Sequence, residues 1–192
     1  QIMEIGPDPV DMMVGFSHNE AAFEAVSHLI AQNYRRIGFL GARMDPRVQR
    51  RLEGYRDAMA AAGLLDPRLI LTTPVPTSVS MGGTLFADML IQAPDIDAVF
   101  CVNDDIALGV LFECQRRQIS VPEDMAIVGF NDLEFMASAV PALTSVRTNR
   151  YEMGSTAISM VMSAIEGKRP SSPVVDLGFE LMIRRSSLAR RQ

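Results

Sequence analysis

The chain has 192 residues, of which 48% are hydrophobic and 21% charged, and its formal net charge is −5. This length and composition are typical of one globular domain, or of one domain with part of a second. The acidic balance excludes a surface that neutralises many phosphates, so any DNA contact must come from another segment. No run approaches the roughly 20 apolar residues of a membrane span, and residues 1–4 lack the basic segment of a secretion signal. We therefore expect a cytoplasmic protein without membrane contact.

Helices and short apolar strands alternate through the middle of the chain. Apolar residues at helical spacing predict helices over residues 20–32, 47–62, 81–91 and 104–117. Short, continuously apolar runs predict strands over residues 35–40, 69–71, 98–102 and 125–130. Strands of this kind, separated by helices, indicate a parallel sheet covered on both faces, which is a doubly wound α/β domain.

The two ends of the chain depart from this alternation. One helix, over residues 151–165, is predicted among strand candidates at 2–5, 13–16, 143–146, 174–177 and 179–183. We interpret these strands as pieces of a second sheet whose partners precede Gln1, and the chain as a fragment of a longer protein. The arginine pairs at 184–185 and 190–191 are interpreted as a solvated tail.

Polar side chains follow the predicted strands at the edge where ligands bind in open α/β sheets. An arginine-rich loop, residues 41–51, follows the first strand, Asn103-Asp104-Asp105 follow the third, and Asn131-Asp132 follow the fourth. Each asparagine or aspartate could instead cap the helix that begins there. Arginine and asparagine groups around one crevice suit vicinal hydroxyls and a carboxylate, so a polyol or sugar acid is the expected ligand.

The catalytic motifs that the sequence lacks favour binding over turnover. The sequence has no glycine-rich nucleotide-binding loop, no serine-hydrolase elbow and no Cys/His metal pattern. His18 and His28 precede the first strand of the sheet, where a general base for the crevice is not expected, and His28 is interpreted as a helix-surface residue. We expect no catalytic residue, no metal and no cofactor.

Cysteines and paired acidic residues also have structural interpretations. Cys101 and Cys114 lack the short spacing of metal ligands, so buried thiols are expected. Asp104-Asp105 and Glu123-Asp124 are adjacent and do not converge, so we expect surface or capping roles for them.

Seven segments carry a more specific signal, in one order and spacing: residues 16–20, 36–41, 51–55, 98–109, 121–124, 127–132 and 141–146. In these segments the chain resembles the regulatory region of the LacI/GalR (lactose-repressor) family of transcriptional regulators, and the resemblance extends from about Val14 to Arg185. Residues 112–117 and 129–135 are similar to repressors of gluconate utilisation within that family.

The resemblance implies a type I periplasmic-binding-protein-like fold with part of a second, similar subdomain that is truncated. Residues 1–19 would end the amino-terminal subdomain and cross over, and residues 20–133 would form the carboxy-terminal subdomain. Residues 134–167 would cross back into the amino-terminal subdomain, and residues 168–192 would supply the final crossover strands and tail. The helix-turn-helix head that binds operator DNA would lie outside this chain.

The resemblance also implies which residues contact a small-molecule effector. Family members bind it with the residues at the positions of Arg51, Asn103 and Asn131, and Arg47 and Ser78 are further candidates. Asn131 stands where the family usually has aspartate. The missing carboxylate removes a repulsion against an anion, which favours a sugar acid such as gluconate over a neutral sugar.

A homodimer is expected, because the family pattern places dimer contacts near Leu108 and Ala139. The implied mechanism is allosteric: effector bound between the subdomains favours one orientation of them and thereby alters DNA binding. Two alternatives stay open at this point. One is a sugar-binding protein of a transport system, which shares the fold, and the other is a sugar-modifying enzyme on a Rossmann-like sheet.

Overall fold

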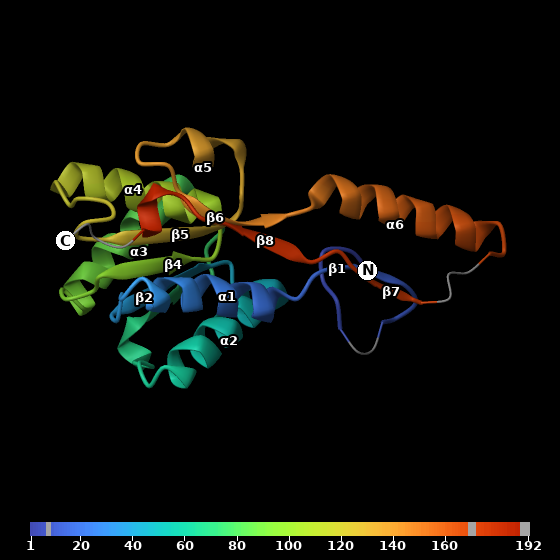
Figure 1. Cartoon of the computed structure of the whole chain (residues 1–192), viewed down its shortest axis with the longest axis horizontal. Coiled ribbons are helices and arrows are strands. Elements are labelled where there is room, and N and C mark those ends of the chain that lie inside the picture. The colour runs from blue at the N-terminus through green and yellow to red at the C-terminus, as the bar shows by residue number, and fades with distance from the viewer. Residues whose placement is uncertain (7–8, 169–171, 189–192) are drawn as a thin grey trace.

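A six-stranded sheet forms the centre of the structure, and a smaller two-stranded sheet lies apart from it (Figure 1). The computed structural model describes residues 1–6, 9–168 and 172–188. The strands of the large sheet are β2 (Ile37–Ala42), β3 (Ile70–Thr73), β4 (Ala98–Cys101), β5 (Ala126–Asn131), β6 (Thr144–Thr148) and β8 (Phe179–Met182). Their order is β3-β2-β4-β5-β6-β8, and all neighbours are parallel except β6 and β8, which are antiparallel.

Helices cover both faces of the large sheet. The helices are α1 (His18–Ala31), α2 (Pro46–Ala61), α3 (Val79–Gln92), α4 (Asp104–Arg117), the short α5 (Glu134–Ser138) and α6 (Arg150–Ile165), with 3₁₀ turns at Pro67–Leu69 and Arg185–Ser187. In Figure 1, α1 and α2 lie together on one face, and α3 and α4 lie together on the other. The doubly wound parallel sheet is therefore confirmed.

The core explains why the central strands read as continuous apolar runs. Every residue of β2 and β4 is buried, because each strand is covered on both faces. Four aromatic rings cross this core in a row: the ring centroids of Tyr55 and Phe39 are 5.4 Å apart, those of Phe39 and Phe100 are 6.0 Å apart, and those of Phe100 and Phe130 are 6.4 Å apart. The two thiols, Cys101 and Cys114, are buried and free, as expected.

Polar residues at helix starts set several of the element boundaries. Asn103 caps α4, because its side-chain oxygen accepts a hydrogen bond from the Ile106 amide at 3.1 Å. Asp45 caps α2 in the same way, and Gly63, with φ of +70°, follows the end of α2 in the left-handed conformation that favours glycine. The predicted helix over residues 104–117 agrees with α4 at both ends.

The assignment of two terminal segments to a second sheet is wrong. Strand β6 pairs with β5, and β8 pairs with β6, so residues 144–148 and 179–182 extend the large sheet. The link from β5 to β6 is short and contains only α5, a helix that was not predicted from the sequence. Strands joined by a short link usually lie side by side. Strands β6 and β8 thus belong to the large sheet. The division into two subdomains at residues 19, 133 and 167 stays a prediction.

The smaller unit contains β1 (Met13–Gly15), β7 (Val174–Asp176) and α6. Strands β1 and β7 are parallel, and α6 packs beside β1 at the end of the molecule away from α3 and α4 (Figure 1). The strand expected at residues 2–5 is reduced to a single bridge between Ile2 and Val14. Met3 has φ of +75°, which breaks the extended conformation there.

Arg184 is not a solvated tail residue, contrary to the expectation. Its side chain is 16% exposed and lies 2.6 Å from Asp132 Oδ1, and its Nη1 also donates to the Leu143 carbonyl at 2.8 Å. Arg185 pairs with Glu123, and residues 190–191 lie outside the described residues. Within the described ranges, no helix has the length and hydrophobicity needed to cross a bilayer.

Candidate functional site

A pocket of about 170 Å³ lies at the carboxyl ends of the central strands. Strand order reverses between β2 and β4, and such a switch point is where open α/β sheets bind ligands. The pocket is lined by Met3, Ala42, Arg43, Asp45, Arg47, Val48, Arg51, Thr77, Val102, Asn103 and Asn131.

Four of the five predicted contact residues, Arg51, Asn103, Asn131 and Arg47, therefore line one pocket. Ser78 does not line it, although Thr77 beside it does. The Ser78 hydroxyl caps α3 instead, accepting a hydrogen bond from the Met81 amide at 3.1 Å. Helix capping thus explains Ser78, which was predicted as a candidate ligand contact.

Arg51 brings a buried cation to this pocket. Arg51 is 6% exposed, and its guanidinium carbon lies 3.7 Å from the centroid of the Phe130 ring. Its Nε donates to His18 Nδ1 at 3.1 Å, and its Nη1 donates to the Val102 carbonyl. Burial lowers the pKa of the guanidinium to about 9, so it remains a cation at neutral pH.

The charge of Arg51 has no direct counter-ion. Among the described residues, no carboxylate lies within 4.0 Å of its guanidinium, and its Nη2 makes no hydrogen bond. Arg47, at the pocket wall, pairs with Asp45 at 3.2 Å, and Arg43 adds a third positive charge. Three arginines against one aspartate make the pocket electropositive, which suits an anionic ligand.

Asn103 has a structural role and a free group. Its Oδ1 caps α4, as described above, while its Nδ2 makes no hydrogen bond within the described part of the chain. The capping interpretation and the ligand-contact interpretation are therefore compatible, since each uses a different atom of the amide.

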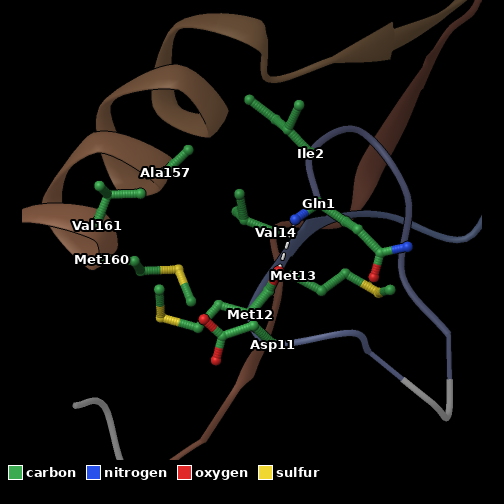
Figure 2. A pocket seen from close by; sticks show the side chains of 9 residues that line it. All are labelled: Gln1, Ile2, Asp11, Met12, Met13, Val14, Ala157, Met160 and Val161. Atoms are coloured by element: carbon green, nitrogen blue, oxygen red, sulfur yellow. Dashed lines mark hydrogen bonds between the residues drawn. The ribbon is translucent and has the colours of Figure 1, made fainter. Parts of the chain in front are cut away.

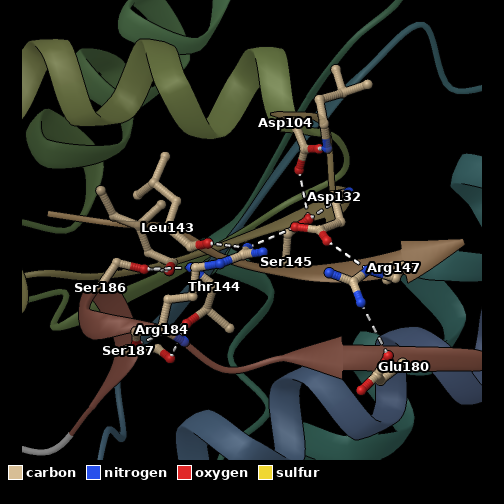
Figure 3. A network of polar contacts seen from close by, with 12 residues as sticks. Asp104, Asp132, Leu143, Thr144, Ser145, Arg147, Glu180, Arg184, Ser186 and Ser187 are labelled. Carbon is tan, nitrogen blue, oxygen red and sulfur yellow. Dashed lines mark hydrogen bonds and ion pairs between the residues drawn. The ribbon is translucent and has the colours of Figure 1, made fainter. Parts of the chain in front are cut away.

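Asn131 enters the pocket from an unusual backbone conformation at the end of β5. Its φ is +112° and that of Asp132 is +53°, a region that side-chain-bearing residues rarely adopt but that Asn and Asp tolerate. Two buried groups hold this turn (Figure 3): Asp104 accepts from the Leu133 amide at 2.7 Å, and Ser145 accepts from the Asp132 amide at 3.1 Å.

Asp104 supports the turn beside the pocket through contacts that were not predicted from the sequence. We expected a surface or capping role, but the residue is 0% exposed and also accepts from Ser145 Oγ at 2.7 Å. Burial raises the pKa of its carboxyl to about 7. Its role depends on β6 lying next to β5, and residue spacing alone gave no signal of that pairing.

An arginine and acid cluster lies beside this turn. Asp132 accepts from Arg147 Nε at 2.9 Å as well as from Arg184, and Arg147 also pairs with Glu180 at 3.4 Å (Figure 3). The cluster thus joins the end of β5 to β6 and to β8. A wider hollow of about 530 Å³, lined by residues 131–132 and 147–152, adjoins the first pocket at Asn131.

A third cavity lies away from these charges, between β1 and α6 (Figure 2). It measures about 370 Å³, and its lining is mostly apolar, with side chains such as Val14, Ala157, Met160 and Val161. It lacks the convergent polar groups that fix a small polar ligand.

His28 is half-buried and lies 2.8 Å from Ser187 Oγ, so its interpretation as a helix-surface residue is wrong. His18 is 1% exposed and contacts Arg51. Among the residues that the structure describes, no group of three or more His, Cys, Asp or Glu side chains could hold a metal ion.

The sheet, its switch-point crevice and its electropositive lining define a ligand-binding domain of the periplasmic-binding-protein type. Residues 26–187 match the family described as periplasmic binding protein-like domain. The chain belongs to this family and is the effector-binding domain of a LacI-type transcriptional regulator.

Individual relatives agree with that assignment. The chain is 44% identical over 174 residues to the HTH-type transcriptional regulator GntR of Pseudomonas aeruginosa, covering 91% of this chain and 51% of the relative. It is similar to the crystal structure of transcription regulator GntR from Chromobacterium violaceum, with 45% identity, a TM-score of 0.94 and coverage of 96% of this chain and 68% of that one. It also resembles a transcriptional regulator CelR–cellobiose complex, with 29% identity, a TM-score of 0.87 and coverage of 96% and 57%.

These relatives are regulators of transcription and not enzymes. The chain spans about half the length of the curated relatives it matches. Family membership therefore describes this domain, and the ligand and partners of the whole protein are proposals.

Proposed function

We propose that this domain senses a sugar acid such as gluconate and thereby controls operator binding by a helix-turn-helix head. The ligand binds in the crevice through Arg51, Asn103 and Asn131, with Arg47 at its edge. The protein acts as a cytoplasmic homodimer, with contacts near Leu108 and Ala139. The observation that carries this proposal is the buried Arg51 cation, which lines the pocket and has no carboxylate within 4.0 Å of its guanidinium among the described residues.

The charge of the pocket favours an acid over a neutral sugar. A buried cation without a counter-ion is costly, and a ligand carboxylate supplies the missing charge together with strong, charge-assisted hydrogen bonds. The asparagine amides at positions 103 and 131 can donate to or accept from hydroxyl groups of the same ligand. A sugar acid has both kinds of group.

A neutral sugar is the second candidate, because one structural relative is a cellobiose complex. Asn103 and Asn131 would hydrogen-bond neutral hydroxyls as well as those of an acid. The neutral sugar leaves the Arg51 charge unpaired, however, so we expect it to bind more weakly.

Isothermal titration tests the proposal. Gluconate and glucose are titrated into the full-length protein, its Arg51→Ala variant and an Arg56→Ala control, in which an exposed arginine of the same helix is removed. We expect saturable binding of gluconate to the wild type and the control, weaker binding of glucose, and loss of gluconate binding in Arg51→Ala. Tight binding of glucose without binding of gluconate would retain the family and overturn the sugar-acid assignment.

A further inference from the structure

His18 lies between the pocket arginine and the main chain of the first segment. Its Nδ1 is 3.1 Å from Arg51 Nε, and its Nε2 is 2.8 Å from the Met3 carbonyl oxygen. The imidazole is enclosed by Phe16, with ring centroids 4.4 Å apart, and by Phe130, with centroids 5.9 Å apart. Water therefore cannot replace either partner, because the residue is 1% exposed.

These two neighbours leave one protonation state for the ring. Arg51 Nε always carries a hydrogen and can only donate, so Nδ1 must be the bare acceptor. The Met3 carbonyl can only accept, so Nε2 must carry the hydrogen. The ring is consequently neutral and held as a single tautomer, and burial also lowers its pKa to about 3.

The orientation of Arg51 depends on this acceptor. The Arg51 side chain is held by His18 Nδ1, the Val102 carbonyl and the face of the Phe130 ring, all of them uncharged. With Nε and Nη1 engaged there, Nη2 remains free of protein partners within the described residues, and Arg51 lines the pocket. A carboxylate partner in place of His18 would neutralise the cation and weaken its attraction for an anion.

We propose that His18 is a positioning residue for the effector: its bare Nδ1 holds Arg51 so that a charged and unpaired guanidinium edge faces an anionic ligand. This inference rests on the proposed function, since it concerns the same pocket. His18 thus helps the site to select an acid through Arg51, and does not itself touch the ligand.

Two substitutions of His18 separate the acceptor from the ring. His18→Asn places an amide oxygen near the former Nδ1 and loses the bond to Met3, whereas His18→Gln keeps a donor near Nε2 and offers only a methylene toward Arg51. Both remove the imidazole, so they differ mainly in which hydrogen bond they retain. His28→Gln is the control, because the same substitution falls on the same helix near Ser187 and away from the pocket.

Gluconate affinity of the full-length protein is measured for each variant by isothermal titration, beside its melting temperature. We expect His18→Asn and His28→Gln to remain within about threefold of the wild type, and His18→Gln to bind about tenfold more weakly, as expected for loss of a hydrogen bond to a charged group. Equal affinity of the two His18 variants, or wild-type affinity of His18→Gln, would overturn the inference.

A nuclear magnetic resonance measurement on the wild type tests the inference even if the His18 variants fail to fold or the protein binds no sugar acid. With ¹⁵N-labelled histidine and arginine, and His18 assigned in the wild type by its through-space contacts with Phe16 and Phe130, we expect a bare Nδ1 coupled to Arg51 Nε–H with or without gluconate. A proton on His18 Nδ1 overturns the inference, even if both variants fail to fold. If the coupling is present but the wild type binds no sugar acid, the proposed function fails and the local geometry stands.

Discussion

At the scale of single residues, the pocket is defined by a cation that the protein itself does not neutralise. Desolvation opposes the charge of Arg51, and the neighbouring carbonyl, imidazole and aromatic ring only partly replace water. A ligand carboxylate would gain more here than at an exposed arginine, because the interaction is formed away from solvent. The proposed selectivity for an acid thus rests on the finding that no carboxylate among the described residues lies within 4.0 Å of Arg51.

Asn131 offers a test of that selectivity. Asn131→Asp changes one amide to a carboxylate of the same shape at the pocket wall and should reduce gluconate affinity about tenfold, through repulsion between like charges. Glucose affinity should change less, because glucose carries no charge. The control is Asn33→Asp, an exposed residue following α1, and the measurement is the ratio of the two affinities by titration. An unchanged ratio in Asn131→Asp would contradict the charge argument.

The raised pKa of the buried Asp104 carboxyl should make the stability of the protein fall as pH rises. Its carboxyl pKa rises from 3.8 to about 7 on folding, so the folded state binds more protons than the unfolded state between these values. The free energy of unfolding therefore loses a contribution as pH rises through this range. Asp104→Asn removes that loss, and the stability of the variant relative to wild type should increase by on the order of 4 kcal/mol between pH 4 and pH 8.

Urea unfolding of both proteins across this pH range measures the difference. Contributions from other titrating groups, His18 included, occur in both proteins and cancel in the comparison. Parallel curves for wild type and Asp104→Asn would show that Asp104 is ionised in the folded state without penalty.

At the scale of elements, glycines determine how closely α3 and α4 approach. A methyl group at Gly109 would overlap the Val79 carbonyl oxygen and would lie 2.8 Å from the Gly83 amide nitrogen. Both contacts are backbone, which cannot rotate away as a side chain can. The two helices that begin at the crevice therefore lie as close together as their backbones allow.

Gly109→Ala should consequently destabilise the protein by about 1–3 kcal/mol, the usual cost of overpacking. Gly154→Ala is the matched control, because nothing lies within 4 Å of the added methyl group on α6. It should stabilise the helix by about 0.5–1 kcal/mol. Chemical unfolding compares the two variants, and destabilisation of both to the same extent would contradict the close-packing account.

The elements of the central sheet could be predicted from the sequence because their signals are local. The buried runs of β2, β4 and β5, and the start of α4 after Asn103, follow from hydrophobic periodicity and capping. Strands β6 and β8 were predicted but assigned to the wrong sheet, because pairing between strands depends on tertiary structure, which periodicity does not report. The pocket was anticipated from strand ends, while the contacts of His18 with Arg51 and of Asp104 with Ser145 were not, since these partners are distant in sequence.

At the scale of the whole molecule, the proposed homodimer would bring this domain into contact with a second copy. The proposed contact residues Leu108 and Ala139 are half-buried, and exposed apolar side chains lie near them: Phe112 is 42% exposed and Val140 80% exposed. Gln115 on α4 donates to the Val140 carbonyl at 3.2 Å, so α4 and the segment after α5 form one surface. An apolar surface of this kind suits an interface between subunits.

Val140→Glu should therefore shift the homodimer toward monomer without loss of the fold, because the side chain is exposed in the single chain. Ile91→Glu is the control, since Ile91 is 81% exposed and belongs to a different helix, α3. Light scattering across a dilution series measures the mass. A monomeric wild type, or identical dissociation of the two variants, would remove Val140 and its neighbours from the interface.

The central claim is that a sugar acid at Arg51 controls DNA binding, and the most direct test measures both at once. Operator DNA, selected from a random oligonucleotide pool with the full-length protein, is titrated by fluorescence anisotropy with and without saturating gluconate. We predict that gluconate changes the operator Kd of the wild type about tenfold, and that Arg51→Ala binds the operator as the wild type does but no longer responds. An operator Kd unaffected by gluconate in the wild type, or changed equally in Arg51→Ala, would contradict this account.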